Sequence, residues 1–111
     1  HNYNLTLDPS YSYEGKTYLK ITDETGRGVY FHHIGDDKYV GAFKEKTTVA
    51  TDGGSYIWNR LNDRRYGFTS EGKLSWIEDA AGNQIQIAYN TEGHMELSPG
   101  DSRQVTLLDL L

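Results

Sequence analysis

The sequence predicts an all-β fold of antiparallel strands joined by tight turns, and three observations support this. Nine tyrosines, three phenylalanines and two tryptophans stand beside twelve glycines and only two prolines, which is typical of strands separated by turns. Apolar and polar residues alternate in several stretches, whereas no stretch repeats apolar residues at the spacing of a helix face. Glycines recur at regular intervals behind small or polar residues. The length of 111 residues fits one domain or a piece of a larger one.

Alternation of side chains marks the strands. In the stretch 84–89, Ile85, Ile87 and Tyr89 fall on one face and two glutamines on the other. The segments 29–31 and 56–58 carry bulky residues on both faces, so we expect something to pack on each side of them. Shorter alternating pairs are Leu19 and Ile21, Tyr66 and Phe68, and Val105 and Leu107.

Four tetrapeptides predict the turns: residues 23–26, 69–72, 79–82 and 90–93, each ending in glycine. A type I turn favours a short polar side chain at its first position, which bonds the backbone two residues on. Glycine is then favoured at the fourth position, where the chain enters the left-handed region. Gly72, Gly82 and Gly93 are ten and eleven residues apart, which is the spacing of one strand and one turn. The sequence therefore predicts an antiparallel meander.

A longer repeat overlies this spacing. Glu71-Gly72-Lys73 leads through Ile77 to a turn at 79–82 and then to Ile85 and Ile87. Glu14-Gly15-Lys16 leads in the same way through Ile21 to a turn at 23–26 and then to Val29 and Phe31, with one extra residue. A third copy begins at Glu92-Gly93-His94 and ends near Val105 and Leu107, with a degraded central turn around Pro99-Gly100. Neighbouring hairpins of this kind must stack to bury a core.

The run Tyr66-Gly67-Phe68-Thr69-Ser70-Glu71-Gly72-Lys73-Leu74, continued through Ile77, Asp79, Gly82-Asn83, Ile85, Ile87 and Tyr89-Asn90 to Gly93, resembles the RHS, or YD, repeat. Asn90 stands where that family has the Asp of its Tyr-Asp pair. Lys73 and His94 replace the Arg that follows glycine, and Met95 replaces Leu. The stretch from Asn2 to Phe31 is similar to the segment that leads into an RHS array, with a looser match.

The resemblance implies a structural role. RHS arrays resemble a long β-ribbon that spirals into a hollow shell, which encloses a C-terminal effector in bacterial polymorphic toxins; wall-associated proteins, insecticidal toxin complexes and teneurins carry similar arrays. By this resemblance, residues 1–64 lead into the array and residues 65–111 form the repeats, the last one degenerate. It also implies a secreted or cell-surface parent, with the rest of the array and an enclosed module as partners. The repeat-motif residues are Tyr66, Phe68, Gly72, Leu74, Ile77, Asp79, Gly82, Asn83, Ile85, Ile87, Tyr89 and Gly93.

Charge and composition disfavour several function classes. Sixteen acidic against eleven basic residues give a net charge of −5, which argues against a nucleic-acid groove and against docking on an anionic membrane. No apolar run is long enough to span a bilayer. The absence of cysteine excludes disulfides, thiol catalysis and cysteine-based zinc sites. We expect no cofactor, no metal and no enzymatic activity.

Individual residues that suggest chemistry have simpler explanations. His32 and His33 are adjacent, so on a strand they point to opposite faces and do not readily share a metal. Asp23-Glu24 and Asp36-Asp37 lack the alternating oxygen ligands of a calcium loop and fit turns better. Glu78-Asp79 is an acidic pair of the kind that sixteen acids supply by chance. Arg64-Arg65 is a small basic spot, interpreted as a partner for nearby acids.

The aromatic residues leave an alternative open. Fourteen aromatic side chains would suit a sugar-stacking surface in a module that binds cell-wall carbohydrate or a surface protein. Tyr66, Phe68, Tyr89, Trp58 and Trp76 fall, however, on strand positions that a repeat core would bury. Unpaired sheet edges would also favour self-association of the chain on its own.

Overall fold

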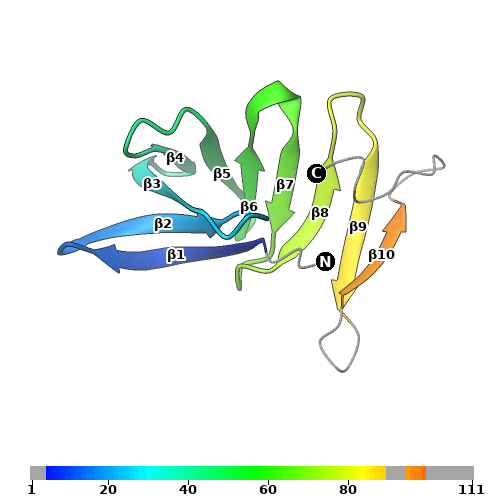
Figure 1. The fold of residues 1–111 in the computed structure, drawn as a ribbon, viewed down its shortest axis with the longest axis horizontal. Helices are drawn as coiled ribbons and strands as arrows, with labels where there is room; N and C mark the ends of the chain where they lie inside the picture. The colour runs from blue at the N-terminus through cyan, green and yellow to red at the C-terminus, as the bar shows by residue number, and fades with distance from the viewer. Residues whose placement is uncertain (1–4, 90–94, 100–111) are drawn as a thin grey trace.

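The protein is one antiparallel β-sheet that curls over its own core (Figure 1), as seen in a computed structural model that describes residues 5–89 and 95–99. Ten strands follow one another in the sheet in chain order, and each pairs with the next as a meander. The prediction of an all-β, antiparallel hairpin fold is confirmed. The strands are β1 (Thr6–Tyr13), β2 (Lys16–Thr22), β3 (Gly28–Gly35), β4 (Lys38–Gly41), β5 (Thr48–Asp52), β6 (Ser55–Asn59), β7 (Arg65–Phe68), β8 (Leu74–Glu78), β9 (Gln84–Tyr89) and β10 (Met95–Pro99), and η1 (Leu61–Asp63) is a short 3₁₀ turn.

The core lies on the inner face of the curl. Alternation places every second side chain of a strand inward, as Leu19 and Ile21 in β2 and Ile85 and Ile87 in β9 illustrate. In Figure 1, β1 and β2 run roughly at right angles to β7 and β8, and the start of β1 meets the lower end of those two strands. The inner face is formed by Leu5, Leu7, Leu19, Ile21, Val29, Phe31, Val49, Trp58, Tyr66, Phe68, Leu74, Ile77, Ile85 and Ile87, all of them buried.

A backbone contact closes the curl. The Leu7 amide in β1 donates a hydrogen bond of 2.9 Å to the carbonyl oxygen of Gly72, in the turn between β7 and β8. Thr6 forms a bridge with Lys73 beside it. A Cβ atom at position 72 would lie 1.8 Å from the Leu7 carbonyl oxygen, so this approach requires glycine. The first strand is thereby fastened to a turn more than sixty residues further along the chain.

Three of the predicted turns have the same geometry. The amides of Gly26, Gly72 and Gly82 donate to the carbonyl oxygen three residues earlier, at 3.0, 2.9 and 3.1 Å. These glycines have φ values of 89°, 86° and 85°, in the left-handed region where a side chain is strained. In two turns an aspartate, Asp23 or Asp79, accepts backbone hydrogen bonds from residues two and four positions later. The fourth predicted turn, 90–93, lies outside the described residues.

The longer repeat is matched at its central turn. Ile21 pairs with Val29 across the 23–26 turn, and Ile77 pairs with Ile85 across the 79–82 turn, in the same register. The opening turns differ: Glu14 and Gly15 both have positive φ, as in a two-residue type I′ hairpin, whereas Gly72 belongs to a longer turn. The extra residue in the first series is therefore accompanied by a different hairpin.

The sheet is continuous across the predicted boundary between residues 1–64 and 65–111. β6 and β7 pair from Tyr56 with Phe68 to Asn59 with Arg65. The division into a leading segment and repeats rests on the resemblance to the RHS/YD repeat, and it stays a prediction.

A β-bulge in β1 changes which face its side chains occupy. Asp8 pairs with Lys20 and Tyr11 with Tyr18, so β1 spans three residues where β2 spans two. Pro9 lies within this bulge, in the first strand of the sheet, and has no paired residue in β2; edge strands and bulges are where a sheet tolerates proline. The side chain of Leu7 therefore points into the core while that of Tyr11 lies on the outer face. A bulged edge with proline also discourages pairing with another chain, so edge-driven self-association, still a prediction, would use β10.

The two tryptophans, both expected in the core, differ in burial. Trp58 is buried as predicted, but Trp76 is only half-buried because its neighbour Ile77 takes the inward position. Trp76 lies on the outer face over Gly67, where an added Cβ would lie 2.1 Å from the indole ring. The side chain of Tyr89 lies outside the part that the structure describes.

Replacing Gly72 by alanine tests the closure of the curl, with Gly82 as the matched control. Both glycines have φ near 85°, so alanine at either costs about 1–2 kcal/mol of unfolding free energy. Nothing lies within 4 Å of a Cβ at 82, whereas one at 72 meets the Leu7 backbone. We expect Gly72→Ala to lose about 1–3 kcal/mol more than Gly82→Ala in urea unfolding. Equal losses would show that the contact with β1 contributes no stability.

Candidate functional site

The predicted repeat-motif residues occupy the core and the turns. Seven of the twelve are buried: Tyr66, Phe68, Leu74, Ile77, Asn83, Ile85 and Ile87. Gly72, Asp79 and Gly82 form turns, and Asn83 donates its side-chain amide to Asp79 at 2.9 Å. The side chain of Tyr89 and the whole of Gly93 lie outside the described residues. The placed residues thus form the core and the turns, and among them Tyr66 also lines the hollow described next.

One hollow in the surface surrounds Arg60. Trp58 and Tyr66 are cross-strand partners on β6 and β7, and Arg60 follows β6 directly. The guanidinium carbon of Arg60 lies 4.4 Å from the Trp58 ring centroid and 5.2 Å from that of Tyr66. One guanidinium nitrogen donates to both carboxylate oxygens of Glu24, in the turn after β2, at 3.0 Å each. The hollow has a volume of about 480 Å³, and six of its twelve lining residues are charged.

The ionisable groups around Arg60 stay charged and pair with one another. Burial disfavours the charged form of Arg60, but the hydrogen bond to Glu24 and the nearby Tyr66 and Glu24 outweigh it and raise its pKa. Burial likewise raises the pKa of the Asp23 carboxyl, yet hydrogen bonds from the Thr25 hydroxyl and from the amides of Arg27 and Thr25, with the charge of Arg60, lower it below its usual value. Arginine and carboxylates here satisfy each other, and the arrangement joins the turn after β2 to the end of β6.

A second chain of hydrogen bonds runs beside the first. The Trp58 indole donates to the Thr47 hydroxyl at 2.9 Å, and Thr47 donates to Glu45. Arg27 pairs with the other oxygen of Glu45 at 3.3 Å. This network anchors the loop between β4 and β5 to the buried tryptophan. Among the described residues, every buried side-chain nitrogen or oxygen has a hydrogen-bond partner, so no buried polar atom of this hollow lacks a partner that a ligand would have to supply.

The two adjacent histidines, which could suggest a metal site, contact different aromatic rings. The ring of His32 lies 5.2 Å from that of Tyr18, and the ring of His33 lies 4.8 Å from that of Tyr39. Within residues 5–89 and 95–99, no three His, Asp or Glu side chains are grouped closely enough to hold a metal ion.

The acidic and basic pairs take part in turns and ion pairs. Asp37 accepts a hydrogen bond from the Thr51 hydroxyl at 2.7 Å. Arg65 pairs with Glu78 at 3.1 Å, as expected for a partner of nearby acids.

The outer face of the sheet carries an aromatic cluster that was not predicted from the sequence. It consists of Tyr11, Tyr13, Tyr18, Tyr30 and Phe43, on the outer face of β1, β2 and β3 and in the loop after β4. Lys20 lies above this cluster, with its ammonium 4.3 Å from the Tyr11 ring centroid. The bulge at Pro9 brings Tyr11 and Tyr13 to this face, and alternation alone assigns them to the other.

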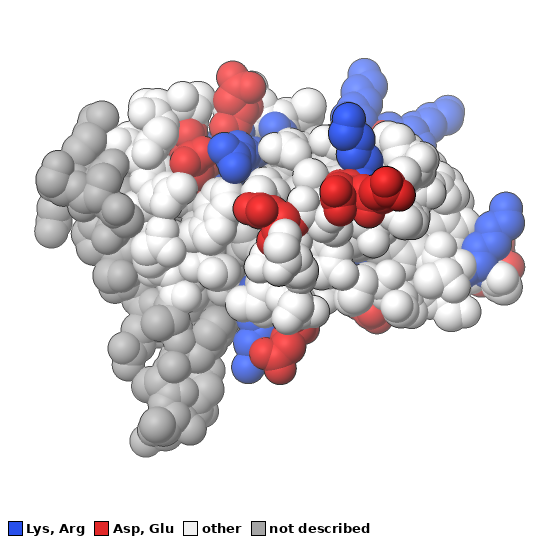
Figure 2. All heavy atoms as spheres, turned by 180° about the vertical axis from the view of Figure 1, so that it is seen from behind, with Lys and Arg blue, Asp and Glu red and all other residues white. Residues whose placement is uncertain are grey.

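Surface charge is mixed where it can be seen. Figure 2, from behind, shows acidic and basic side chains scattered among uncharged ones, without a broad field of either sign. In the part of the chain that the structure describes, no helix is long and apolar enough to cross a membrane.

Comparisons with family models, with curated proteins and with solved structures gave no match to this chain.

Replacing Arg60 by alanine is expected to destabilise the fold by about 2 kcal/mol, because a stacked cation and a charge-assisted hydrogen bond are lost together. Arg27 is the control, since its side chain is 66% exposed and its partner is Glu45. Arg27→Ala should change the unfolding free energy by no more than about 0.5 kcal/mol. Similar losses in the two variants, measured in urea, would contradict the structural role of the Arg60 site.

Asp23 is expected to make stability depend on acidity. Its folded pKa lies below the unfolded value of 3.8, so its contribution is complete above pH 3.8 and disappears as the pH falls through the folded value. Asp23→Asn should cost about 1 kcal/mol at neutral pH. The difference in unfolding free energy between the two proteins should shrink as the pH falls below 3.8, and a constant difference would exclude this role.

Proposed function

We propose that this chain is a structural repeat domain of the RHS/YD type, which forms part of a β-sheet wall and performs no catalysis. The observation that carries the proposal is the recurrence of one turn with one register. Ile21 faces Val29 and Ile77 faces Ile85 across turns with equivalent hydrogen bonds. A unit that repeats in this way adds one hairpin of wall each time and extends the same core.

The proposed mechanism is enclosure or display. The inner face of the sheet carries the apolar core, so added hairpins would extend that core and continue a barrier between two spaces. The polar groups of the Arg60 site pair with each other, which suits a wall better than a reaction centre. In this proposal the parent is secreted or surface-associated, and the wall surrounds or presents a toxin or adhesion module.

A structure of the polypeptide encoded by the source gene, by electron cryo-microscopy, tests this proposal. We expect further hairpins to pair onto β10 and to continue the wall around a separate module. Limited proteolysis of the same protein should leave that module intact while exposed loops are cut. A β10 edge that remains unpaired in the encoded protein, with no enclosed or attached module, would overturn the proposal.

A second candidate function is a binding module for cell-wall carbohydrate or a surface protein. The outer aromatic cluster favours it, because Tyr13 and Phe43 remain exposed in that cluster although the core has no need of them. The two functions are compatible, since they use opposite faces of the sheet.

A further inference from the structure

Phe43 is an exposed aromatic residue held in a strained conformation. Its side chain is 63% exposed, and its φ of 55° lies in the left-handed region, which bulky residues avoid. Lys44 follows with a φ of 68°. Two consecutive residues of this kind cost free energy, and such strain persists only where the surroundings impose it. The Phe43 ring is mostly exposed, so burial of its apolar surface does not offset that cost.

The surrounding loop imposes this conformation. The amide of Ala42 donates to the Tyr30 carbonyl at 2.8 Å, and the amide of Glu45 donates back to Ala42 at 3.1 Å. The loop folds tightly over Gly41, where an added Cβ would lie 2.1 Å from the Glu45 carbonyl oxygen. The Glu45 carboxylate accepts hydrogen bonds from both the amide and the hydroxyl of Thr47. Phe43 is thus presented on a preorganised loop.

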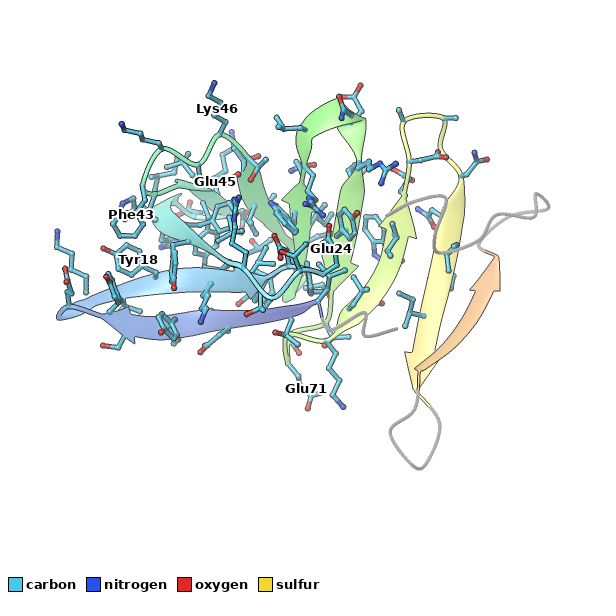
Figure 3. All side chains as sticks on the ribbon, in the orientation of Figure 1. Tyr18, Glu24, Phe43, Glu45, Lys46 and Glu71 are labelled. Carbon is cyan, nitrogen blue, oxygen red and sulfur yellow. The ribbon has the colours of Figure 1, made fainter. Side chains whose placement is uncertain are left out.

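The rings beside Phe43 form a corner. Tyr13 and Tyr30 are nearly parallel, with 26° between their planes, and Phe43 stands at 89° to each of them. Tyr18 lies beneath, buried, with its ring centroid 5.5 Å from that of Phe43, and Figure 3 shows these two side chains next to each other. The corner opens into a second hollow of about 570 Å³, here called the aromatic hollow, lined by Tyr13, Tyr30 and Phe43 and by Arg27, Lys44 and Glu45.

The rim opposite the rings carries donors and acceptors. Arg27 and Glu45 form an ion pair of 3.3 Å, and the Arg27 side chain is largely in solvent. The charges of Arg27 and Glu45 compensate each other, so these two groups can hydrogen-bond a neutral ligand; Lys44 is the remaining charged residue of the lining. Aliphatic lining is limited to Val29 and Ala42, which gives little for the leucine- or isoleucine-type anchors of a protein partner.

We propose that the aromatic hollow binds a neutral saccharide chain, with Phe43 and Tyr13 packing on the C–H faces of the sugar rings and with Arg27 and Glu45 bonding their hydroxyl groups. A sugar ring offers an apolar face and a polar edge, which matches two aromatic walls opposite a polar rim. The net charge of −5 disfavours an acidic polysaccharide. This inference gives the second candidate function a site and a ligand class, and it does not depend on the wall proposal.

The test is titration of the ¹⁵N-labelled chain with cellohexaose, xylohexaose and chitohexaose, followed by NMR. We expect at least one of them to shift the amides of residues 28–30 and 42–45. Phe43→Ala should weaken that binding about tenfold or more, as expected for loss of one aromatic stacking partner. Phe43→Tyr keeps the ring and should retain the affinity. A structural cap over Tyr18 would instead alter the unfolding free energy without altering affinity.

Ile34 provides the matched control. It is 58% exposed, near the end of β3 that lies away from the hollow, and Ile34→Ala should leave saccharide binding unchanged. Three results would overturn the proposal: no binding of any of the three saccharides by the folded protein, binding that Phe43→Ala does not weaken, or shifts confined to other residues. Sedimentation velocity adds a fourth, since a dimer that Phe43→Ala dissociates would identify the hollow as an interface between two copies. Each of these outcomes is distinct from failure of the wall proposal, which is tested by the structure of the polypeptide that the source gene encodes.

Discussion

The contact between β1 and the turn joining β7 and β8 is the constraint on which the rest of this structure depends. A single sheet leaves its apolar face in water unless a second layer covers it or the sheet curls over it. Residues 5–89 and 95–99 supply no second layer, so the curl must cover the core. Leu7 and Gly72 hold that curl through a backbone hydrogen bond of 2.9 Å. Only glycine fits at 72, because a Cβ there would overlap the Leu7 carbonyl oxygen.

Cross-links beyond the opposite end of β6 and β7 reinforce the curl. The Arg60–Glu24 pair connects segments 36 residues apart, and the series Trp58, Thr47 and Glu45 connects the core to the loop after β4. The Arg60–Glu24 pair is partly buried and the Trp58–Thr47 hydrogen bond is buried, so they add directional bonds away from solvent. The same cross-links fix the loop that carries Phe43, which is why an exposed ring can occupy a strained position.

Local patterns in the sequence were sufficient for the class, the turns and much of the register. Asp23 and Gly26, like Asp79 and Gly82, specify their turn through their own side chain and backbone, without help from distant residues. Features set by the choice of inward face, by a bulge or by long-range contacts were not predictable in this way. Trp76 follows the outer face because Ile77 takes the inner one, the bulge at Pro9 reverses the facing of Tyr11 and Tyr13, and the partner of Arg60 is remote in sequence.

The separation of the two faces bears on how a wall and a binding surface can coexist. Tyr13 and Phe43 lie outside the core cluster and are exposed, so they are available to the proposed binding surface. The aromatic hollow lies at one end of the sheet, on β1, β3 and the loop after β4, away from the β10 edge where more hairpins would add. A growing wall would therefore leave the hollow open. In these two proposals enclosure would use one face and saccharide recognition the other, and Glu45 would serve both stability and binding, because it also holds the loop after β4 through Thr47.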